Sequence, residues 1–258
     1  MRKAIYCLAA TGALGLTAGV PATALAAGSS SPPGYQAGLQ PVPTNNVTGS
    51  GSATLSLSGD QATVTVDTTG LLAGVPHAMH IHVDGMGVCP TAAAATNLNG
   101  HTAISTSDGH PSYGMIGTSL TTSGDTSPAS GLAVDRFPTG SSFHYARTVT
   151  VTDDVANNIR SGKAVIVVHG LDYNGSGKFT DVLGPSDLDP TLPQTATAPA
   201  LCGTLQAMPT GGAATGSGAT QHRPDDAALV TGGSFLLVAA AGGAWVLRRR
   251  RPVGDDRS

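Results

Sequence analysis

Two neighbouring segments of the chain alternate strictly between polar and apolar side chains. Residues 52–58 read Ser-Ala-Thr-Leu-Ser-Leu-Ser, and residues 61–67 read Gln-Ala-Thr-Val-Thr-Val-Asp. A period of two puts the apolar side chains on one face of a β-strand. Gly59 and Asp60, which separate the two segments, are typical of a tight turn. The two segments therefore predict a β-hairpin.

Three further segments have the composition of strands, and one has that of a short helix. The strands are expected at residues 78–83, 147–152 and 163–168, and the helical turn at residues 153–160. Residues 45–206, which contain these segments, are poor in aromatic residues and long enough to bury a core of their own. We therefore expect an all-β fold, an antiparallel β-sandwich or β-barrel.

The N-terminal segment is typical of a secretory signal. Arg2 and Lys3 precede an apolar run over residues 4–20, and residues 24–26, Ala-Leu-Ala, fit the small-x-small pattern of a cleavage site. Removal of this segment also removes Cys7, which leaves Cys89 and Cys202. An even pair of cysteines in an exported domain suggests one disulfide.

The C-terminal segment has the pattern of an anchor. Residues 227–247 carry no charge and are followed at once by the four arginines 248–251. About 20 apolar residues span a bilayer, and arginines mark its cytoplasmic side. A cell-wall sorting signal ends in the same way, so membrane and wall anchoring both stay open, and the pattern suggests a Gram-positive bacterium.

These end segments divide the chain and place the protein on the extracellular face of the membrane or wall. The expected parts are a signal peptide (1–26), an N-terminal linker (27–44), a β-domain (45–206), a flexible linker (207–226), a transmembrane or sorting-signal helix (227–247) and a basic cytoplasmic tail (248–258).

Charge excludes one class of partner. The chain has no glutamate, and residues 27–206 hold twelve aspartates against five lysines and arginines, a formal net charge of −7. Nucleic acid is therefore not expected as a partner, because no basic stripe exists to meet phosphates. The same balance gives no general attraction for small anions.

Three histidines have the placement of metal ligands. His80 and His82 are two residues apart on an expected strand, so both imidazoles lie on one face. His169 ends the apolar strand that begins at residue 164. Imidazole is a preferred ligand of copper and zinc. The sequence therefore predicts a metal site.

The segment around these histidines resembles the copper/zinc superoxide dismutases. Residues 70–82, Gly-Leu-Leu-Ala-Gly-Val-Pro-His-Ala-Met-His-Ile-His, are similar to that family's glycine-leucine turn and its His-x-x-His-x-His strand. Residues 162–169 are similar to the strand that delivers the terminal copper ligand. Residues 201–205 are similar to the last strand with its disulfide cysteine. The resemblance covers most of residues 45–206.

The resemblance implies a Greek-key β-barrel that binds copper and removes superoxide. The implied copper ligands are His80, His82, His101 and His169, and His101 would also be the catalytic bridging residue that releases and rebinds copper during the cycle. The resemblance further implies a structural role for His77 through backbone hydrogen bonds and the orientation of a ligand by Asp172. A Cys89–Cys202 bridge would hold the metal-site loop.

Two departures from the family matter. The family's zinc ligands have no complete counterpart, because only His110 follows His101 in the next loop, where it is a possible extra metal ligand. A copper-only form is therefore the nearest family member. Pro199 stands where the family has an arginine that attracts superoxide, and the negative domain provides no electrostatic steering.

Two alternatives stay open. Residues 172–179, Asp-Tyr-Asn-Gly-Ser-Gly-Lys-Phe, resemble the start of a calcium loop, but Leu183 takes the place of the bidentate carboxylate, and a glycine-rich turn is the other interpretation. The second alternative concerns function: a chordin-type repeat, a non-enzymatic extracellular β-domain, also carries a His-x-His strand and would use this domain to bind a metal or a partner.

Overall fold

The computed structural model describes residues 32–209 of the chain. The predicted signal peptide (1–26), most of the flexible linker, the apolar segment (227–247) and the basic tail (248–258) lie outside the described residues. No helix within residues 32–209 has both the length and the apolar character needed to cross a bilayer.

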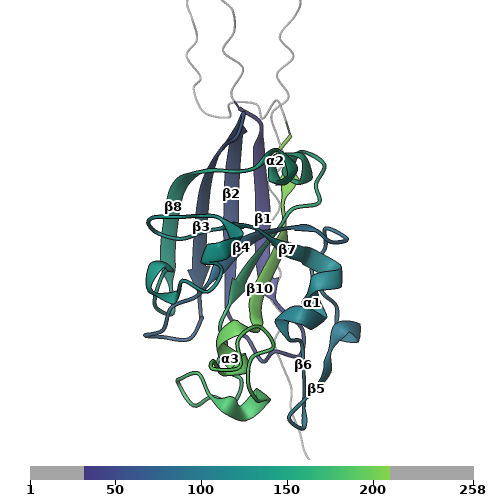
Figure 1. Cartoon of the computed structure of the whole chain (residues 1–258), viewed down its shortest axis with the longest axis vertical. Coiled ribbons are helices and arrows are strands. Elements are labelled where there is room, and N and C mark those ends of the chain that lie inside the picture. The colour runs from purple at the N-terminus through teal and green to yellow at the C-terminus, as the bar shows by residue number, and fades with distance from the viewer. Residues whose placement is uncertain (1–31, 210–258) are drawn as a thin grey trace, which may run out of the picture. The chain divides into compact units, whose positions relative to one another are not determined.

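The described residues form a curled antiparallel sheet that makes a half-barrel (Figure 1). Its strand order is β7-β4-β9-β10-β1-β2-β3-β8, with β11 paired to β1. The strands are β1 (Gly34–Pro41), β2 (Ser50–Ser58), β3 (Gln61–Thr69), β4 (Met79–Asp84), β7 (Gly114–Ser119), β8 (Phe143–Thr150), β9 (Val165–His169), β10 (Pro199–Thr204) and β11 (Gln206–Ala207). A separate two-stranded sheet pairs β5 (Thr96–Leu98) with β6 (His101–Ala103). The all-β prediction is therefore confirmed.

The predicted hairpin is confirmed as β2 and β3. Leu55 pairs with Val64, and both side chains are buried, as the alternation requires. Gly59 makes the turn with a φ of 61°, a backbone conformation that costs glycine little. The other three expected strands appear as β4, β8 and β9, and the helical turn appears as α2 (Asp153–Arg160). The hydroxyl of Thr152 caps this helix by accepting from the Val155 N–H.

The expected domain boundary at residue 45 needs correction. Strand β1 lies in the segment assigned to the N-terminal linker, and it joins β10 to β2 in the middle of the sheet. Tyr35, Ala37 and Leu39 alternate along β1 and are all buried. The folded domain therefore begins near Gly34, because without β1 the sheet would separate into two parts.

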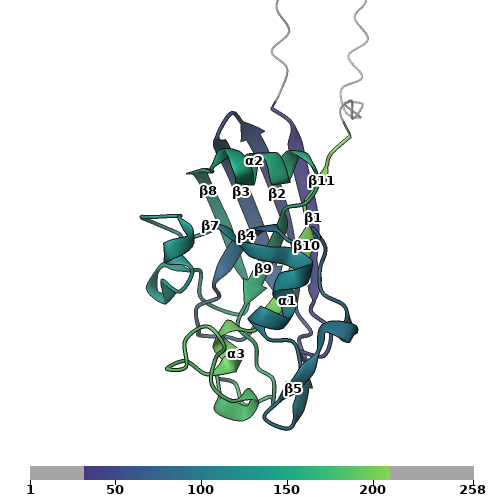
Figure 2. The same cartoon turned by 45° about the vertical axis from the view of Figure 1, so that its right-hand side comes forward.

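Helices and loops cover the outer face of β4 and β9. The inner face carries the main hydrophobic core. On the outer face lie α1 (Thr106–Tyr113) and the loop that contains α3 (Gln194–Thr197) (Figure 2). Helix α1 begins with a capping box in which Ser105 and Asp108 bind each other's backbone N–H groups. Strand β9 is therefore buried on both faces.

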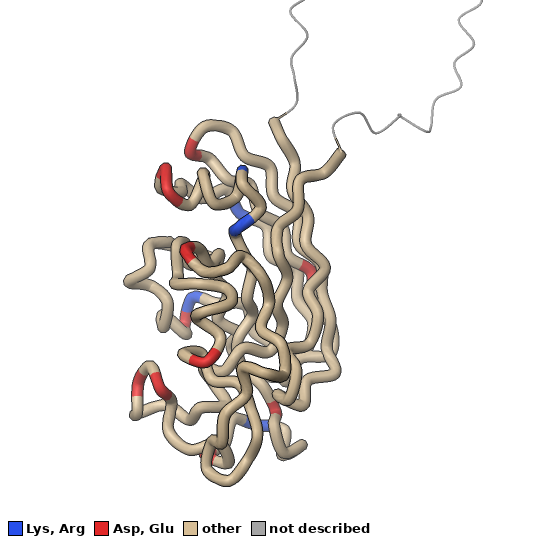
Figure 3. The backbone as a smooth tube through the Cα atoms, turned by 90° about the vertical axis from the view of Figure 1, so that its right-hand side faces the viewer, with Lys and Arg blue, Asp and Glu red and all other residues tan. Residues whose placement is uncertain are grey.

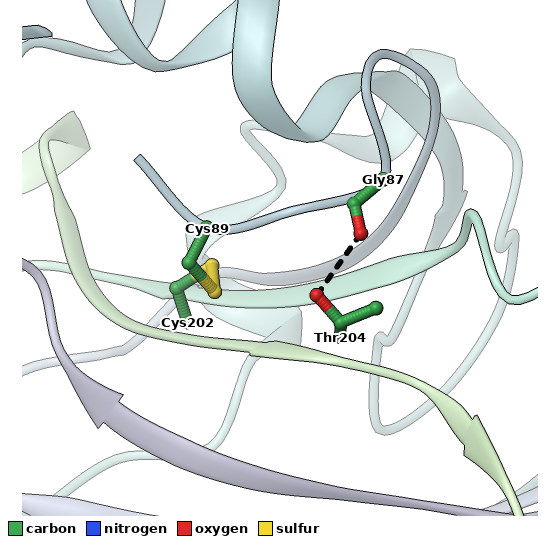
Figure 4. The surroundings of a disulfide bond; sticks show 4 residues. All are labelled: Gly87, Cys89, Cys202 and Thr204. Carbon is green, nitrogen blue, oxygen red and sulfur yellow. Dashed lines mark hydrogen bonds between the residues drawn. A yellow bond between two sulfur atoms is a disulfide. The ribbon is translucent and has the colours of Figure 1, made fainter. Parts of the chain in front are cut away.

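The predicted disulfide is confirmed. Cys89 and Cys202 are bonded, and they join the loop after β4 to strand β10 across 113 residues of sequence (Figure 4). Close by, the hydroxyl of Thr204 donates to the Gly87 carbonyl at 3.0 Å. Two links thus fasten this loop to the outer face of the sheet.

Candidate metal centre

Three histidine side chains converge on the outer face of the half-barrel. His80 and His82 come from β4, and His169 is the last residue of β9. These two strands are neighbours, and the His169 N–H donates to the Ala78 carbonyl at 2.8 Å. The residues between the histidines, such as Ile81, point into the core. The alternation of the two strands therefore brings all three imidazoles to one place.

The three rings are close enough to share one ion. One nitrogen from each of His80, His82 and His169 lies within 4.8 Å of the others. The ring centroids are 5.1 Å apart for His80 and His169, 5.5 Å for His80 and His82, and 5.8 Å for His82 and His169. We call these three residues the histidine triad.

Each ring of the triad is fixed by a backbone carbonyl on its outward side. The contacts join His80 Nε2 to the Gly131 oxygen at 3.0 Å, His82 Nδ1 to the Gly114 oxygen at 2.9 Å, and His169 Nδ1 to the Thr197 oxygen at 2.6 Å. A carbonyl oxygen only accepts, so each of these nitrogens carries the proton. The other nitrogen of each neutral ring therefore presents a lone pair.

The nitrogens with the lone pairs are buried and have no hydrogen-bond partner within residues 32–209. They are Nδ1 of His80, Nε2 of His82 and Nε2 of His169. A buried polar atom without a partner costs about 1 to 3 kcal/mol of stability. A metal ion at the centre of the triad would satisfy all three atoms at once. Carbonyl contacts that orient ligand imidazoles are also typical of metal sites.

Burial keeps the triad neutral. It lowers the pKa of His82 to about 3 and that of His169 to about 4, and it holds the pKa of His80 well below its usual value. For His80 and His82, the positive charge that a protonated His169 would carry lowers the pKa further. Neutral imidazole is the form that binds metals, so the site is ready for a cation at neutral pH.

Aromatic rings and a fourth histidine surround the triad. The Tyr113 ring meets the His82 ring edge-on at 4.6 Å, and Phe137 meets His80 in the same way at 5.6 Å. His110, on α1, has its ring centroid 6.5 Å from that of His82. Burial lowers the pKa of His110, and the carboxylate of Asp187 opposes this effect. His110 thus lies beside the triad and lines the same cavity.

His101, the predicted bridging ligand, lies apart from the triad. It begins strand β6 in the small hairpin, its side chain is exposed, and its ring stands 5.5 Å from that of Tyr173. Among residues 32–209, the metal-ligating side chains that come together are His80, His82 and His169. Helix α1 thus presents His110, rather than His101, on the side of the triad.

His77 and Asp172 both make local structural contacts. The His77 nitrogens face the carbonyl oxygens of His169 and Leu72, each at 2.9 Å, so this buried ring ties the loop before β4 to the end of β9. The Asp172 carboxylate accepts from the backbone N–H groups of Ser176 and Gly177, each at 2.8 Å. Asp172 thus holds a glycine-rich turn, and carbonyl groups take the role expected of it at the triad.

No protein-family model matches the chain. No curated protein sequence matches it with statistical significance. The chemistry of the site itself is therefore the basis for its function.

Proposed function

We propose that this protein is a copper-binding domain whose histidine triad holds a single ion. One observation carries the proposal: three buried, neutral imidazoles aim unpartnered nitrogens at a common point. Within residues 32–209 no hydrogen-bond partner offsets the cost of burying these nitrogens. Three nitrogen ligands with one side left open are typical of sites that bind a metal and a further small molecule.

Copper is the ion we propose. Imidazole suits copper and zinc alike, and affinity for nitrogen sites is highest for Cu²⁺ among the common divalent ions. The triad residues also stand in the order of the copper ligands of copper/zinc superoxide dismutases. Within residues 32–209 a second cluster of three metal-ligating side chains is not found, which favours a site for one ion over a paired copper and zinc centre.

We also propose that the half-barrel is a relative of the superoxide dismutase barrel with Greek-key connections. Several strands pair with partners that are distant in sequence, such as β4 with β9, β10 with β1 and β3 with β8, as long crossing connections require. The outer-face position of the triad supports the relation, and so does the bridge between the loop after β4 and strand β10. Export and surface anchoring remain part of the proposal.

Removal of superoxide is the activity that this relation suggests. Bound copper would supply the electron acceptor and donor that convert two superoxide ions and two protons into oxygen and hydrogen peroxide. The chain would orient the ion through the carbonyl-fixed rings and shield it behind Tyr113 and Phe137. The half-buried His110 ring lies 6.5 Å from the His82 ring, centroid to centroid, and lines the space over the triad.

A non-enzymatic binding domain is the second candidate, and electrostatics favours it. No Lys or Arg among the described residues lines the space over the triad, and Pro199 occupies the position of the family's arginine. The nearby Asp187 adds negative charge. Without a cation to draw it in, superoxide would reach the site only by unassisted diffusion. A copper store or a receptor for another ligand would not need such steering.

A paired measurement on the full chain tests these functions. We would supply equal concentrations of copper and zinc, remove the excess, and measure both bound metal and superoxide removal. We expect one copper ion per chain, lost in His169→Ala and retained in His144→Ala, an exposed histidine outside the triad. Copper-dependent turnover would favour the enzyme, and tightly bound copper without turnover would favour the binding domain. Retention of copper by His169→Ala would contradict the site.

A further inference from the structure

A cavity of about 480 Å³ opens directly over the histidine triad. All three triad residues and His110 contribute to its floor. Ligand pockets of a few hundred Å³ are the size that encloses a small organic molecule. Superoxide, with two atoms, would leave most of this volume unused.

The walls of this cavity are apolar. They are built from Ile116 on β7, Leu132 and Val134 before β8, and Phe179, Leu188 and Leu192 in the loop before α3. Leu132, Val134 and Leu188 remain 39%, 47% and 39% exposed, respectively. Large apolar side chains on a surface lose free energy to water, and burial against a ligand recovers it. These exposed groups gather at the mouth of one cavity.

The cavity also has no charged side chain to hold an anion. The described Lys and Arg residues are few and scattered along the backbone (Figure 3). Lys178, next to the wall residue Phe179, and Arg136, two residues after Val134, are the basic residues closest in sequence to the wall, and neither lines the cavity. The Arg136 guanidinium donates to the carbonyls of Ser123 and Asp125 and to the hydroxyl of Ser130. The Asp187 carboxylate, near His110, would repel an anion.

The polar wall groups other than histidines are already satisfied. The Thr106 hydroxyl donates to the Thr197 carbonyl at 2.7 Å, and the Thr197 hydroxyl bonds with Ser186 at 2.7 Å. Within residues 32–209, the fully buried side-chain atoms of this cavity that have no hydrogen-bond partner are the triad nitrogens. A ligand would therefore meet histidine ring atoms at the floor, from the triad and from His110, and mainly apolar surface at the walls.

We propose that the cavity binds a small, neutral, largely apolar organic molecule that offers one nitrogen or oxygen atom to the metal. The inference rests on the proposed copper site for the polar end of the ligand. The apolar walls act independently of the metal and select the rest of the molecule. This ligand class fits the binding function better than it fits superoxide removal.

Three probes of the copper-loaded full chain test the proposal: 4-phenylimidazole, imidazole and azide. The first two offer the same donor atom with and without an apolar group, and the third is a small anion. Binding would be followed by the change in the visible absorption of copper. We expect 4-phenylimidazole to bind at least ten-fold more tightly than imidazole, and azide to bind most weakly. Equal affinity for the two imidazoles, or a preference for azide, would overturn the proposal.

A pair of variants locates the apolar contact. Leu132→Asp puts a charge in the wall, and Val88→Asp puts the same charge at a similarly exposed valine outside the cavity. We expect Leu132→Asp to lose most of the ten-fold preference while it keeps its copper, and Val88→Asp to keep both. An unchanged preference in Leu132→Asp would contradict this wall assignment. A dimer of the chain that only Leu132→Asp dissociates, with no preference for the phenyl group, would assign the face to a second copy instead.

Calorimetry on the metal-free chain separates the two claims. We expect 4-phenylimidazole to bind more weakly than to the copper form, and imidazole to give no measurable heat. If the chain takes up no copper but still binds 4-phenylimidazole in preference to imidazole, the copper site fails and the apolar cavity stands. If 4-phenylimidazole gives no heat and no spectral change, the proposed ligand class is wrong whatever the metal content.

Discussion

The two faces of strands β4 and β9 differ in what their buried side chains achieve. On the inner face, Ile81 and Ile166 pair across the strands and join the core, where they contact other apolar groups. On the outer face, His80 and His82 are equally buried, yet each keeps a nitrogen without a partner. Both faces belong to the same backbone, so the difference lies in the side chains alone.

This difference separates stability from function. Burial of an apolar side chain stabilises the fold by about 1.5 to 3 kcal/mol, and this gain accounts for the buried side chains of the inner face. Burial of an unpartnered polar atom costs stability, so a bound ligand is the explanation that we propose for the buried histidine nitrogens of the outer face. Three sets of substitutions and one change of pH test this contrast.

Gly114→Ala should strongly destabilise the domain by forcing apart the backbones of β4 and β7. Gly114 has a φ of 89°, and a Cβ there would lie 1.8 Å from the Val83 carbonyl oxygen. We expect a loss of at least about 5 kcal/mol, the range of exceptional substitutions, measured by urea denaturation. Gly59→Ala is the control, since Gly59 also has a positive φ but meets nothing within 4 Å. Equal losses in the two variants would show that the close approach at Gly114 is unimportant.

The disulfide should stabilise the folded domain mainly because it restricts the conformations of the unfolded chain. Replacing Cys89 and Cys202 by Ala together removes a link across 113 residues. We expect the free energy of unfolding to fall by about 4 kcal/mol, as for links that close long loops. The urea midpoint of the double variant, compared with that of the oxidised protein, gives the value. A midpoint within error of the parent's would mean that the bridge contributes nothing.

Ile166→Ala and His82→Leu compare the two faces directly in the metal-free chain. Ile166 is fully buried in the core, so its truncation should cost about 3 kcal/mol through lost contacts and a cavity. His82→Leu removes an unpartnered nitrogen as well as one hydrogen bond, so its change should stay within about 1 kcal/mol. Urea denaturation measures both. A large loss for His82→Leu without metal would show that the triad is a structural element.

Acid should weaken the metal-free fold through the triad. The pKa values of His82 and His169 are about 3 and about 4 in the folded chain, and about 6.5 is usual for an unfolded one. The unfolded chain therefore binds more protons between pH 6.5 and 4, so stability is full above pH 6.5 and falls as the pH drops through this window. Each histidine contributes a slope of about 1.4 kcal/mol per pH unit. His82→Leu should reduce the slope by that amount, and an unchanged slope would refute the burial of a neutral His82.

The strands and the triad were predictable from the sequence because a period of two fixes which residues share a face. His80 and His82 needed only that rule, and His169 needed only its place at the end of an apolar strand. Strand β1 follows the same alternation, but Gly34 and Gly38 weaken its pattern and made the segment resemble a linker. The pairing that makes β1 central is a tertiary fact, which local periodicity does not contain.

The period of two in strands could not predict which loop residues lie beside the triad. His101 and His110 lie in the same stretch between β4 and β7, and which of them faces the triad depends on helix α1 and its capping residues. The carbonyl groups of Gly131 and Thr197 that orient the rings carry no sequence signal, because every residue has one. The apolar cavity was missed for a similar reason, since its walls come from segments that are distant in the chain.

Electron paramagnetic resonance of the copper(II)-loaded full chain tests the histidine triad most directly. We predict one copper ion per chain with hyperfine splitting from three nitrogen ligands, and a changed spectrum with loss of copper in each of His80→Ala, His82→Ala and His169→Ala. His144→Ala, which alters an exposed ring paired with Asp67, should leave the spectrum unchanged. A copper signal that is the same in all four variants, or no bound copper in the parent chain, would contradict the assignment of the triad as a metal centre.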